Sequence, residues 1–471
     1  MSNNPDNRDA VKESFRDRIA TVDESGKRNW IYAQQPKGKF YRIRTYLSIL
    51  YFLIFFGLPF IYVNGRPFLM FNIPETKFII FGKVFWPQDF FIFGLAMIAF
   101  IFFIILFTAS FGRLFCGWAC PQTNFMEMMF RKVEYLVLGS ANEQKALKKA
   151  PWTSSKIRKV ALKHILFFLL AFIIANFFLA YIISIKELWK IITEPISEHV
   201  VGFTSLLAFS GVFYAVYAFF REQACTVVCP YGRLQGVLLD KNSMVVAYDY
   251  KRGEPRGNIK KSTAENPLGD CIDCFQCVRV CPTGIDIRNG VQMECVGCTA
   301  CIDACDSVMD KIGKPRGLVR YASENSIAKG EKLHYTVRMK LYTGLCALVL
   351  VLLSIILVTR KDVTAIVTRA SGQLFQERGD SISNLYNLRV VNKTLNKIPL
   401  TVKLASQDGA VEVIGGAHVE VAKEGQGNGV FFVIIPRKAI QKTKTPIMLN
   451  LYEGNRLIAE AKTIFLAPKQ E

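Results

Sequence analysis

Five long apolar segments dominate the pattern of hydrophobic and polar positions along the chain. They lie at residues 43–63, 90–110, 160–185, 203–220 and 339–358, and some contain hardly a charged residue. A helix needs about 20 predominantly apolar residues to cross a bilayer. Five such segments in one chain argue against the buried helices of a soluble core, so the pattern predicts five transmembrane helices.

The residues after the fifth segment follow a different pattern. From about residue 364 onward, short stretches alternate between apolar and polar side chains, as at Leu388 and Val390, and a period of two is typical of half-buried strands. The pair Gly454-Asn455 separates two further apolar runs, which is a hairpin signal. We therefore expect a C-terminal β-sandwich of about 100 residues.

Composition and charge agree with a membrane protein and indicate its orientation. Hydrophobic residues make up 51% of the chain and charged residues only 21%, which is unusual for a soluble domain. The net charge of +21 does not indicate nucleic-acid binding, because Lys and Arg gather where a membrane topology places cytosolic loops. They are dense at the N-terminus and at residues 131–159 and sparse at 64–89 and 186–202. The N-terminus and the loop after the fourth span should be cytosolic, and the tail should lie outside.

Eight of the 13 cysteines form two closely spaced runs, and these carry the strongest chemical signal. The runs are Cys271-x-x-Cys274-x-x-Cys277-x-x-x-Cys281 and Cys295-x-x-Cys298-x-x-Cys301-x-x-x-Cys305. In two-cluster ferredoxins the fourth cysteine of each run ligates the other cluster. Zinc sites favour longer gaps between pairs of ligands, and a disulfide framework needs an oxidising compartment. We therefore assign Cys271, Cys274, Cys277 and Cys305 to one [4Fe–4S] cluster, and Cys295, Cys298, Cys301 and Cys281 to a second.

Four other cysteines occupy an internal repeat. The second span ends in Arg113-Leu-Phe-Cys116-Gly-Trp-Ala-Cys120-Pro121, and the fourth in Arg221-Glu-Gln-Ala-Cys225-Thr-Val-Val-Cys229-Pro230. Each motif precedes an amphipathic stretch, so a unit of two helices and one motif is used twice. Sulfurs four residues apart share one face of a helix, and the four thiols could converge at the cytosolic edge of the bundle.

The chemistry of these four thiols stays open at this point. Soft thiolates suit Cu(I), zinc or iron–sulfur iron, and a redox dithiol or inert buried cysteines are alternatives. Met126, Met128 and Met129 follow closely and could add thioether ligands, although methionine on an amphipathic helix more often serves apolar packing. The proline after each second cysteine should mark a turn, since it disfavours helix at the preceding residue.

The chain resembles the family of the cytochrome c oxidase accessory protein CcoG, also called FixG or RdxA. The resemblance covers nearly the whole chain. It rests on both Cys-x-x-x-Cys-Pro motifs, on Cys281-Pro-Thr-Gly-Ile-Asp-Ile-Arg288 and on the run from Ala304 to Leu318. It implies an immunoglobulin-like fold for the tail. It also implies reduction of Cu(II) to Cu(I) for assembly of the cbb3-type cytochrome oxidase in a bacterial inner membrane, with the tail in the periplasm.

The resemblance further implies roles and partners. Copper, as a substrate, would be handled by Cys116, Cys120, Cys225 and Cys229, while the clusters relay electrons from a cytosolic donor. The expected partners are membrane lipids, that donor, and copper-delivery proteins or cbb3-type oxidase subunits, with no nucleic acid. Two alternatives remain: quinol dehydrogenases of nitrate-reductase systems, which share the membrane half, and a non-enzymatic assembly scaffold with structural clusters.

The predicted fold class is an α-helical membrane bundle of about five spans. It carries an inserted two-cluster ferredoxin-like domain and a C-terminal all-β immunoglobulin-like sandwich. The expected parts are a cytosolic tail at 1–42, a four-helix membrane domain at 43–235, the ferredoxin-like domain at 236–337, the fifth helix at 338–360 and the periplasmic sandwich at 361–471.

Overall fold

The structure, a computed structural model, describes the chain from residue 21 to residue 468. Within this range it leaves out residues 23–24, 74–76, 87–88, 260–266, 333–334, 361, 373, 395, 406–407, 417, 424 and 441. Residues 1–20 of the expected cytosolic tail lie outside the described part. The chain forms two compact units: one runs up to Gly82 and continues through Phe90–Leu352, and the other comprises Lys83–Asp89 and Leu353–Glu471.

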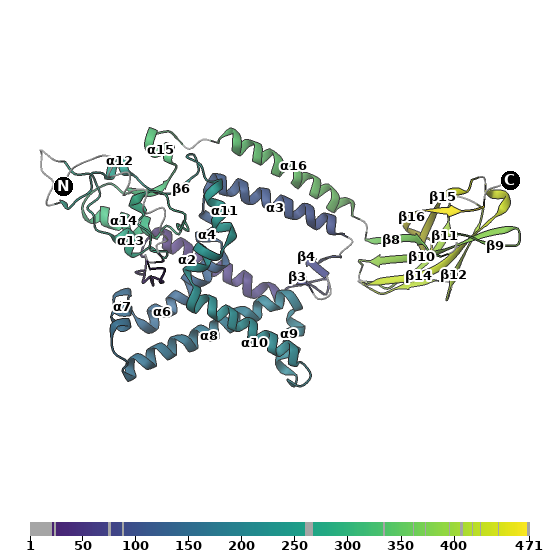
Figure 1. Ribbon diagram of the computed structural model, residues 1–471, viewed down its shortest axis with the longest axis horizontal. Coiled ribbons are helices and arrows are strands. Elements are labelled where there is room, and N and C mark those ends of the chain that lie inside the picture. The colour runs from purple at the N-terminus through teal and green to yellow at the C-terminus, as the bar shows by residue number, and fades with distance from the viewer. Residues whose placement is uncertain are drawn as a thin grey trace. The chain divides into compact units, whose positions relative to one another are not determined.

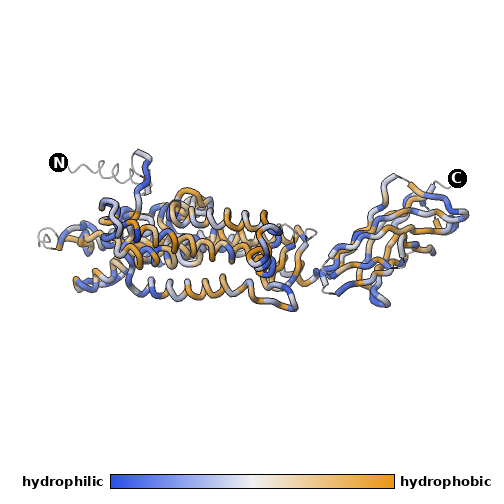
Figure 2. The backbone as a smooth tube through the Cα atoms, turned by 90° about the horizontal axis from the view of Figure 1, so that it is seen from below, coloured by the Kyte–Doolittle hydropathy of each residue, from blue (hydrophilic) through white to orange (hydrophobic). Residues whose placement is uncertain are grey.

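Five helices are long and apolar enough to cross a membrane, as predicted (Figure 1). They are α2 (Lys39–Gly57, extended by η1, Leu58–Phe60), α3 (Phe90–Phe111), α8 (Ser154–Ile183), α10 (Val200–Ala215, extended by the π-helix η4, Val216–Phe220) and α16 (Val337–Thr359). Their apolar stretches are orange in Figure 2. The boundaries differ from those predicted mainly at polar ends, where charged residues continue a helix beyond its apolar stretch.

The helix bundle is held together by an aromatic core. Phe130 and Phe167 are fully buried, and the ring of Phe130 stacks on Tyr217 with centroids 4.3 Å apart. Phe130 ends the π-helix η3 (Met126–Phe130), which lies between α5 (Pro121–Phe125) and α6 (Arg131–Leu138). Met126 belongs to this same core. The helices that follow the first motif therefore pack against α8 and α10.

Short elements complete the connections of the first unit. Helix α7 (Ala141–Lys149) begins at a Ser140 capping box, and α9 (Ile185–Thr193) connects α8 to the chain that leads into α10. Strands β1 (Tyr62–Val63) and β2 (Arg66–Pro67) form one antiparallel pair, and β3 (Leu69–Asn72) and β4 (Lys77–Ile80) form another.

The cysteine-rich insert begins and ends with an antiparallel strand pair. Strand β6 (Val245–Tyr248) pairs with β7 (Val319–Ala322). Between them lie α12 (Tyr250–Gly253), α13 (Gln276–Arg279), the 3-10 helix η7 (Ile287–Asn289) and α14 (Ala300–Lys311), and α15 (Glu324–Lys329) follows β7. The Asp303 carboxylate on α14 accepts hydrogen bonds from the backbone N–H groups of Phe40 (3.0 Å) and Tyr41 (2.7 Å). This contact caps α2 and fixes the insert to the first membrane helix.

The second unit contains a β-sandwich, as the alternating pattern predicts. One sheet has the order β12-β14-β10-β8 with β9 also on β10, and the other has the order β13-β11-β15-β16. The strands are β8 (Val363–Arg369), β9 (Gln376–Arg378), β10 (Ser381–Asn392), β11 (Ile398–Leu404), β12 (Ala410–Ile414), β13 (Val419–Val421), β14 (Gln426–Pro436), β15 (Lys444–Glu453) and β16 (Arg456–Leu466). Tyr386 and Phe431 stack inside it with centroids 5.7 Å apart. The predicted hairpin is present, with Gly454 at a φ of 58° in its turn.

A buried ion-pair group belongs to this second unit as well. The carboxylate of Asp89, close after β5 (Lys83–Phe85), lies 2.7 Å from the Lys393 ammonium and 2.7 Å from the Arg360 guanidinium. The side chains of Asp89 and Lys393 are only 9% and 4% exposed. These contacts tie residues 83–89 to the sandwich.

Candidate metal centres

The cysteine-rich insert folds its eight thiols into two groups around two cavities. One cavity is lined by Cys271, Cys274, Cys277 and Cys305. The other is lined by Cys281, Cys295, Cys298 and Cys301, with Cys277 at its edge. We call these the first and second thiol sets. The fourth cysteine of each run thus lies with the other run.

Local conformation explains how the loops present their sulfurs. Phe275 and Thr299 adopt left-handed backbone conformations, with φ of 57° and 63°, directly before α13 and α14. Each turn lets the loop reverse just before the helix that carries the next cysteine, Cys277 or Cys301. The apolar side chains Ile285, Ile287 and others fill the space around the sulfurs.

Both thiol sets are buried, and this changes their acidity. Burial raises the pKa of Cys277 and Cys305 to about 12, with a further contribution from neighbouring thiolates. Burial likewise raises the pKa of Cys295 to about 11 and that of Cys298 to about 12. A soft metal that binds such thiols must therefore displace their protons.

The residues around the second thiol set fit a bound anionic group. Arg44, on α2, is 4% exposed and donates from Nη1 to the Cys298 carbonyl at 3.0 Å, while its Nε and Nη2 have no hydrogen-bond partner. An uncompensated buried cation is strongly unfavourable. An iron–sulfur cluster ligated by four thiolates carries net negative charge. Four sulfurs in an apolar cavity beside the Arg44 guanidinium, which has no carboxylate partner among the described residues, therefore suit a [4Fe–4S] cluster.

The Cys-x-x-x-Cys-Pro motifs do not have the local geometry that the sequence suggests. We expected both cysteines of a motif on one face of a single helix. Instead α4 (Leu114–Trp118) carries Cys116 and ends, and Cys120 is extended (φ −61°, ψ 126°) before α5 begins at Pro121. The second motif repeats this break, with Cys225 in the π-helix η5 (Ala224–Val228) and an extended Cys229 before α11 (Pro230–Leu238). The residue before a proline avoids the helical region, which explains why the helix stops at each second cysteine.

Each motif receives a polar contact from the helix that follows the other motif. Gln235, on α11 of the second repeat unit, donates from Nε2 to Cys116 Sγ at 3.4 Å. Thr123, on α5 of the first repeat unit, lies with its Oγ1 3.9 Å from Cys225 Sγ. The two repeat units therefore exchange contacts at their first cysteines.

The four motif thiols lie close enough for their charges to change one another's pKa values. The pKa of Cys225 is raised to about 12, first by burial and then by Cys120, Cys116 and Cys229. The pKa of Cys116 is raised to about 11 by burial, and Cys120 and Cys229 add to this effect. The repeat thus brings all four sulfurs into one region.

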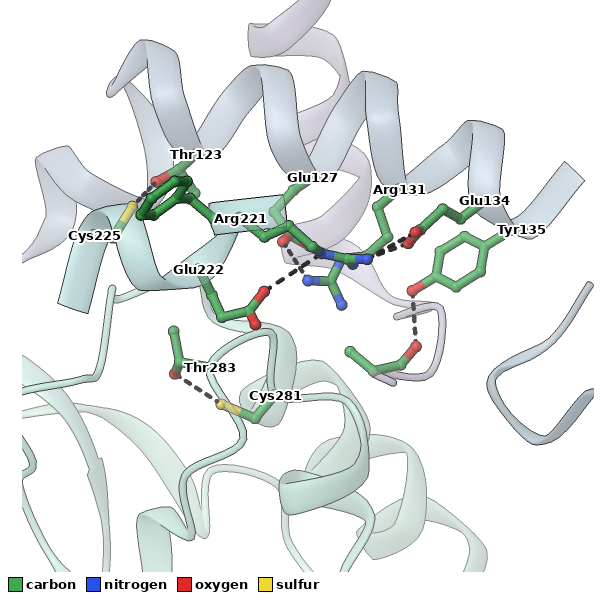
Figure 3. A network of polar contacts seen from close by, with 12 residues as sticks. Thr123, Glu127, Arg131, Glu134, Tyr135, Arg221, Glu222, Cys225, Cys281 and Thr283 are labelled. Carbon is green, nitrogen blue, oxygen red and sulfur yellow. Dashed lines mark hydrogen bonds and ion pairs between the residues drawn. The ribbon is translucent and has the colours of Figure 1, made fainter. Parts of the chain in front are cut away.

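Two arginines add to the contacts between the two repeat units, and the sequence analysis assigned no role to them. Arg221 is 2% exposed and forms a bidentate ion pair with Glu134 of α6, with distances of 2.7 and 2.9 Å (Figure 3). Arg113 donates to the carbonyl of Gly232 on α11. Each arginine precedes the first cysteine of its own motif and reaches the helix behind the other motif. The signal that could have identified them is an arginine three or four residues before the first cysteine of each motif.

The membrane motifs directly contact the loop of the second thiol set. Gly117, on α4, lies so close to Val296 and Gly297 that an added Cβ would be 2.7 Å from their backbone atoms. Cys116 and Cys225 pack against an apolar group that includes Cys298. A cavity is lined by Cys225 and Thr123 on one side and by Thr283 and Val296 on the other; Figure 3 shows Cys225 and Thr283 from this region. The first cysteine of each motif therefore adjoins the second thiol set.

Comparison with known protein families agrees with iron–sulfur chemistry in both regions. A family model described as a 4Fe-4S dicluster domain matches residues 220–324, and one described as a 4Fe-4S binding domain matches residues 93–140. A model described as an IG-like fold at the C-terminus of FixG, putative oxidoreductase, matches residues 353–468. The last match confirms the immunoglobulin-like fold expected for the sandwich.

Curated relatives extend the similarity over most of the chain. Protein RdxA of Cereibacter sphaeroides is 33% identical over 426 residues, which cover 86% of this chain and 89% of RdxA. The chain belongs to the FixG/RdxA family. Protein RdxB of the same organism is 34% identical over 78% of this chain and 80% of RdxB. The nitrogen fixation protein FixG of Rhizobium meliloti is 35% identical over 64% of this chain, and the match covers 59% of the length of FixG. A FixG/RdxA protein with five apolar helices and iron–sulfur domains is a membrane iron–sulfur electron-transfer protein.

Proposed function

We propose that this FixG/RdxA protein reduces Cu(II) to Cu(I) at Cys116, Cys120, Cys225 and Cys229, in support of the assembly of a cbb3-type cytochrome oxidase. The observation that carries the proposal is the convergence of these thiols from both repeat units against the loop of the second thiol set. A site for electron transfer to a soft metal needs soft donors in contact with an electron carrier. This region combines both requirements.

Each thiol group has a defined task in the proposed reaction. The first and second thiol sets each hold one [4Fe–4S] cluster, which supplies a one-electron carrier when bound. The motif thiols bind copper as substrate, and each thiol that coordinates the ion loses its proton to solvent. Gln235, as a hydrogen-bond donor, stabilises the Cys116 thiolate that forms. One electron enters per Cu(II), and apart from the S–H bonds of the coordinating thiols no covalent bond of the protein is broken.

The ligand type favours the reduced product. Thiolates are soft donors and bind Cu(I) in preference to Cu(II). Coordination by these sulfurs therefore raises the driving force for reduction of the bound ion. The extended conformations of Cys120 and Cys229 direct the second sulfur of each motif away from the preceding helix.

The proposed orientation places the insert in the cytosol and the sandwich in the periplasm of a bacterial inner membrane. It follows from the excess of Lys and Arg at the N-terminus and at residues 131–159. A cytosolic donor would then reach the insert, and copper-delivery proteins or oxidase subunits are the expected partners. A reporter active only in the cytosol should work when inserted at 140–150 and fail after Glu471. The reverse pattern would contradict the orientation.

Paired cysteine replacements test the copper site. The double variant Cys116→Ser/Cys120→Ser should abolish reduction of Cu(II) by the pre-reduced protein and leave the cluster absorbance intact. Cys225→Ser/Cys229→Ser should have the same effect. Replacing all four cysteines should lower the rate of Cu(II) reduction little further, because the effects of residues that act as one unit are non-additive. Cys346→Ser, in the buried position of α16, is the matched control. If either double variant still reduced Cu(II) at the wild-type rate, a shared site would be refuted.

A second candidate function rests on the match of residues 93–140 to a 4Fe-4S binding domain. In this alternative the four motif thiols hold iron themselves, and the membrane site serves another electron acceptor or donor such as a quinone. Two clusters require about 8 iron atoms per chain and three require about 12. Anaerobic iron analysis, together with assays of Cu(II) reduction and quinol oxidation, separates the two candidates. A scaffold would show neither activity.

A further inference from the structure

Two buried guanidinium groups without a carboxylate partner border the second thiol set. Arg44 contacts the Cys298 carbonyl, as described above. Arg113 is 7% exposed and donates to the carbonyls of Met293 and Cys295, the latter at 3.3 Å, while its Nε has no hydrogen-bond partner. Among the residues that the structure describes, no carboxylate forms an ion pair with either arginine. Both positive charges are therefore available to a negative group in the second cavity.

The first thiol set has the opposite electrostatic surroundings. Arg288 forms an ion pair with Asp273 and another with Asp286, the latter at 2.6 Å. The exposed Arg279 donates to the Cys274 carbonyl, and Asp306 adds a negative charge beside Cys305. Three carboxylates thus outnumber the two guanidinium groups near the first set.

Fewer carboxylates lie near the second set than near the first, and their negative charge is partly compensated. The negative charge of Glu294 contributes to the raised pKa of Cys295. Asp303 lies two residues after Cys301. The Asp303 carboxylate accepts two backbone N–H groups at the start of α2, where the helix dipole is positive. With Arg44 and Arg113 the formal charges around the second set cancel, whereas the first set has an excess of negative charge.

We propose that Arg44 and Arg113 give the cluster of the second thiol set the higher reduction potential of the two. Reduction adds one negative charge to a cluster, and a buried positive charge stabilises the reduced form because the local dielectric constant is low. With both clusters bound, the residues around the two sets would favour transfer of one electron from the first set to the second, with no proton or bond exchanged. The second set adjoins Cys116 and Cys225, so electrons move toward the motif thiols. The inference rests on the two clusters of the proposed function and not on copper.

A redox titration of the full-length protein tests this order. The protein is purified anaerobically, its iron is counted, and both clusters are titrated with dithionite while their paramagnetic resonance signals are recorded. Arg44→Gln should make reduction at the higher-potential step at least tenfold less favourable, which is about 59 mV for one electron. The lower step should not move. Arg44→Lys retains the charge and should shift the higher step less than threefold.

Asp273, which is exposed, and Glu294, which is half-buried, provide a matched pair that does not depend on a fully buried replacement. Asp273→Asn removes a negative charge beside the first set and should raise only the lower-potential step. Glu294→Gln removes one beside the second set and should raise only the higher step. If these assignments were reversed, or if Arg44→Gln moved the lower step or neither step, the proposed order would be wrong. Wild-type iron well below about 8 atoms per chain would instead refute the two-cluster assignment.

Discussion

The close approach between Gly117 and the loop of the second thiol set leads to a specific prediction about electron transfer. Gly117 lies between Cys116 and Trp118, and the Cβ of an alanine here would be 2.7 Å from the Val296 carbonyl oxygen and from the carbonyl carbon and oxygen of Gly297. Ordinary contacts begin at 3.4 Å. The obstructing atoms belong to the backbone and cannot rotate away, so α4 has to move away from the loop.

The size of the effect follows from two opposing contributions. Extra volume in a packed region is unfavourable by about 1–3 kcal/mol, while alanine is favoured over glycine inside a helix by about 1 kcal/mol. The net change in the free energy of unfolding is therefore small to moderate. The functional change should be larger, because the rate of electron transfer falls steeply as donor and acceptor move apart.

A single-turnover assay measures this change. Pre-reduced protein, freed of reductant, is mixed with Cu(II), and reoxidation of the clusters is followed by absorbance. Gly117→Ala should slow this step at least about tenfold with unchanged iron content. The control is Gly94→Ala on α3, where an added Cβ meets no atom within 4 Å. If both variants reacted at the wild-type rate, tight contact between α4 and the loop would not be required for electron transfer.

Two further predictions concern the clusters and the sandwich. Cys271→Ser and Cys295→Ser should each reduce the iron content of anaerobically purified protein from about 8 to about 4 atoms per chain, and each should remove a different cluster signal. Asp89→Asn should destabilise the unit that contains the sandwich by about 3 kcal/mol, because the buried Lys393 loses a carboxylate, and limited proteolysis should reveal this. Burial raises the pKa of Asp89, but its cationic partners lower it more, so the net pKa is depressed. The stability that Asp89 contributes should therefore be complete at neutral pH and disappear as the pH falls below about 4.

Features encoded by neighbouring residues could be predicted from the sequence alone. A membrane helix such as α3 is a continuous apolar run, and the bilayer rather than a distant segment determines its length. Strand β10 was similarly visible in the alternation around Leu388, and the hairpin of β15 and β16 in the pair Gly454-Asn455.

Features that join distant segments could not be predicted in this way. Gln235 and Thr123 reach cysteines more than 100 positions away, and on an amphipathic helix they look like ordinary polar residues. Gly117 has the same difficulty, because its role depends on the backbone of Gly297. The expectation that both cysteines of a motif share one helix was wrong because it gave the i, i+4 spacing more weight than the following proline.

The exchange of contacts between the repeat units explains why duplication can produce one site instead of two. Arg221 is fully buried, and its left-handed backbone (φ 53°) is itself unfavourable by about 1–3 kcal/mol for a residue other than glycine. Such a residue persists only when its surroundings hold it, and here Glu134 of the other unit does so. A buried ion pair adds little net stability, but loss of one partner leaves an unpaired charge and is strongly destabilising. Without the first unit, Arg221 would keep only the 3.5 Å contact with Glu222 of its own unit. Without the second unit, Glu134 would lose Arg221 and Cys116 would lose Gln235, so docking of both units favours the arrangement of the four thiols.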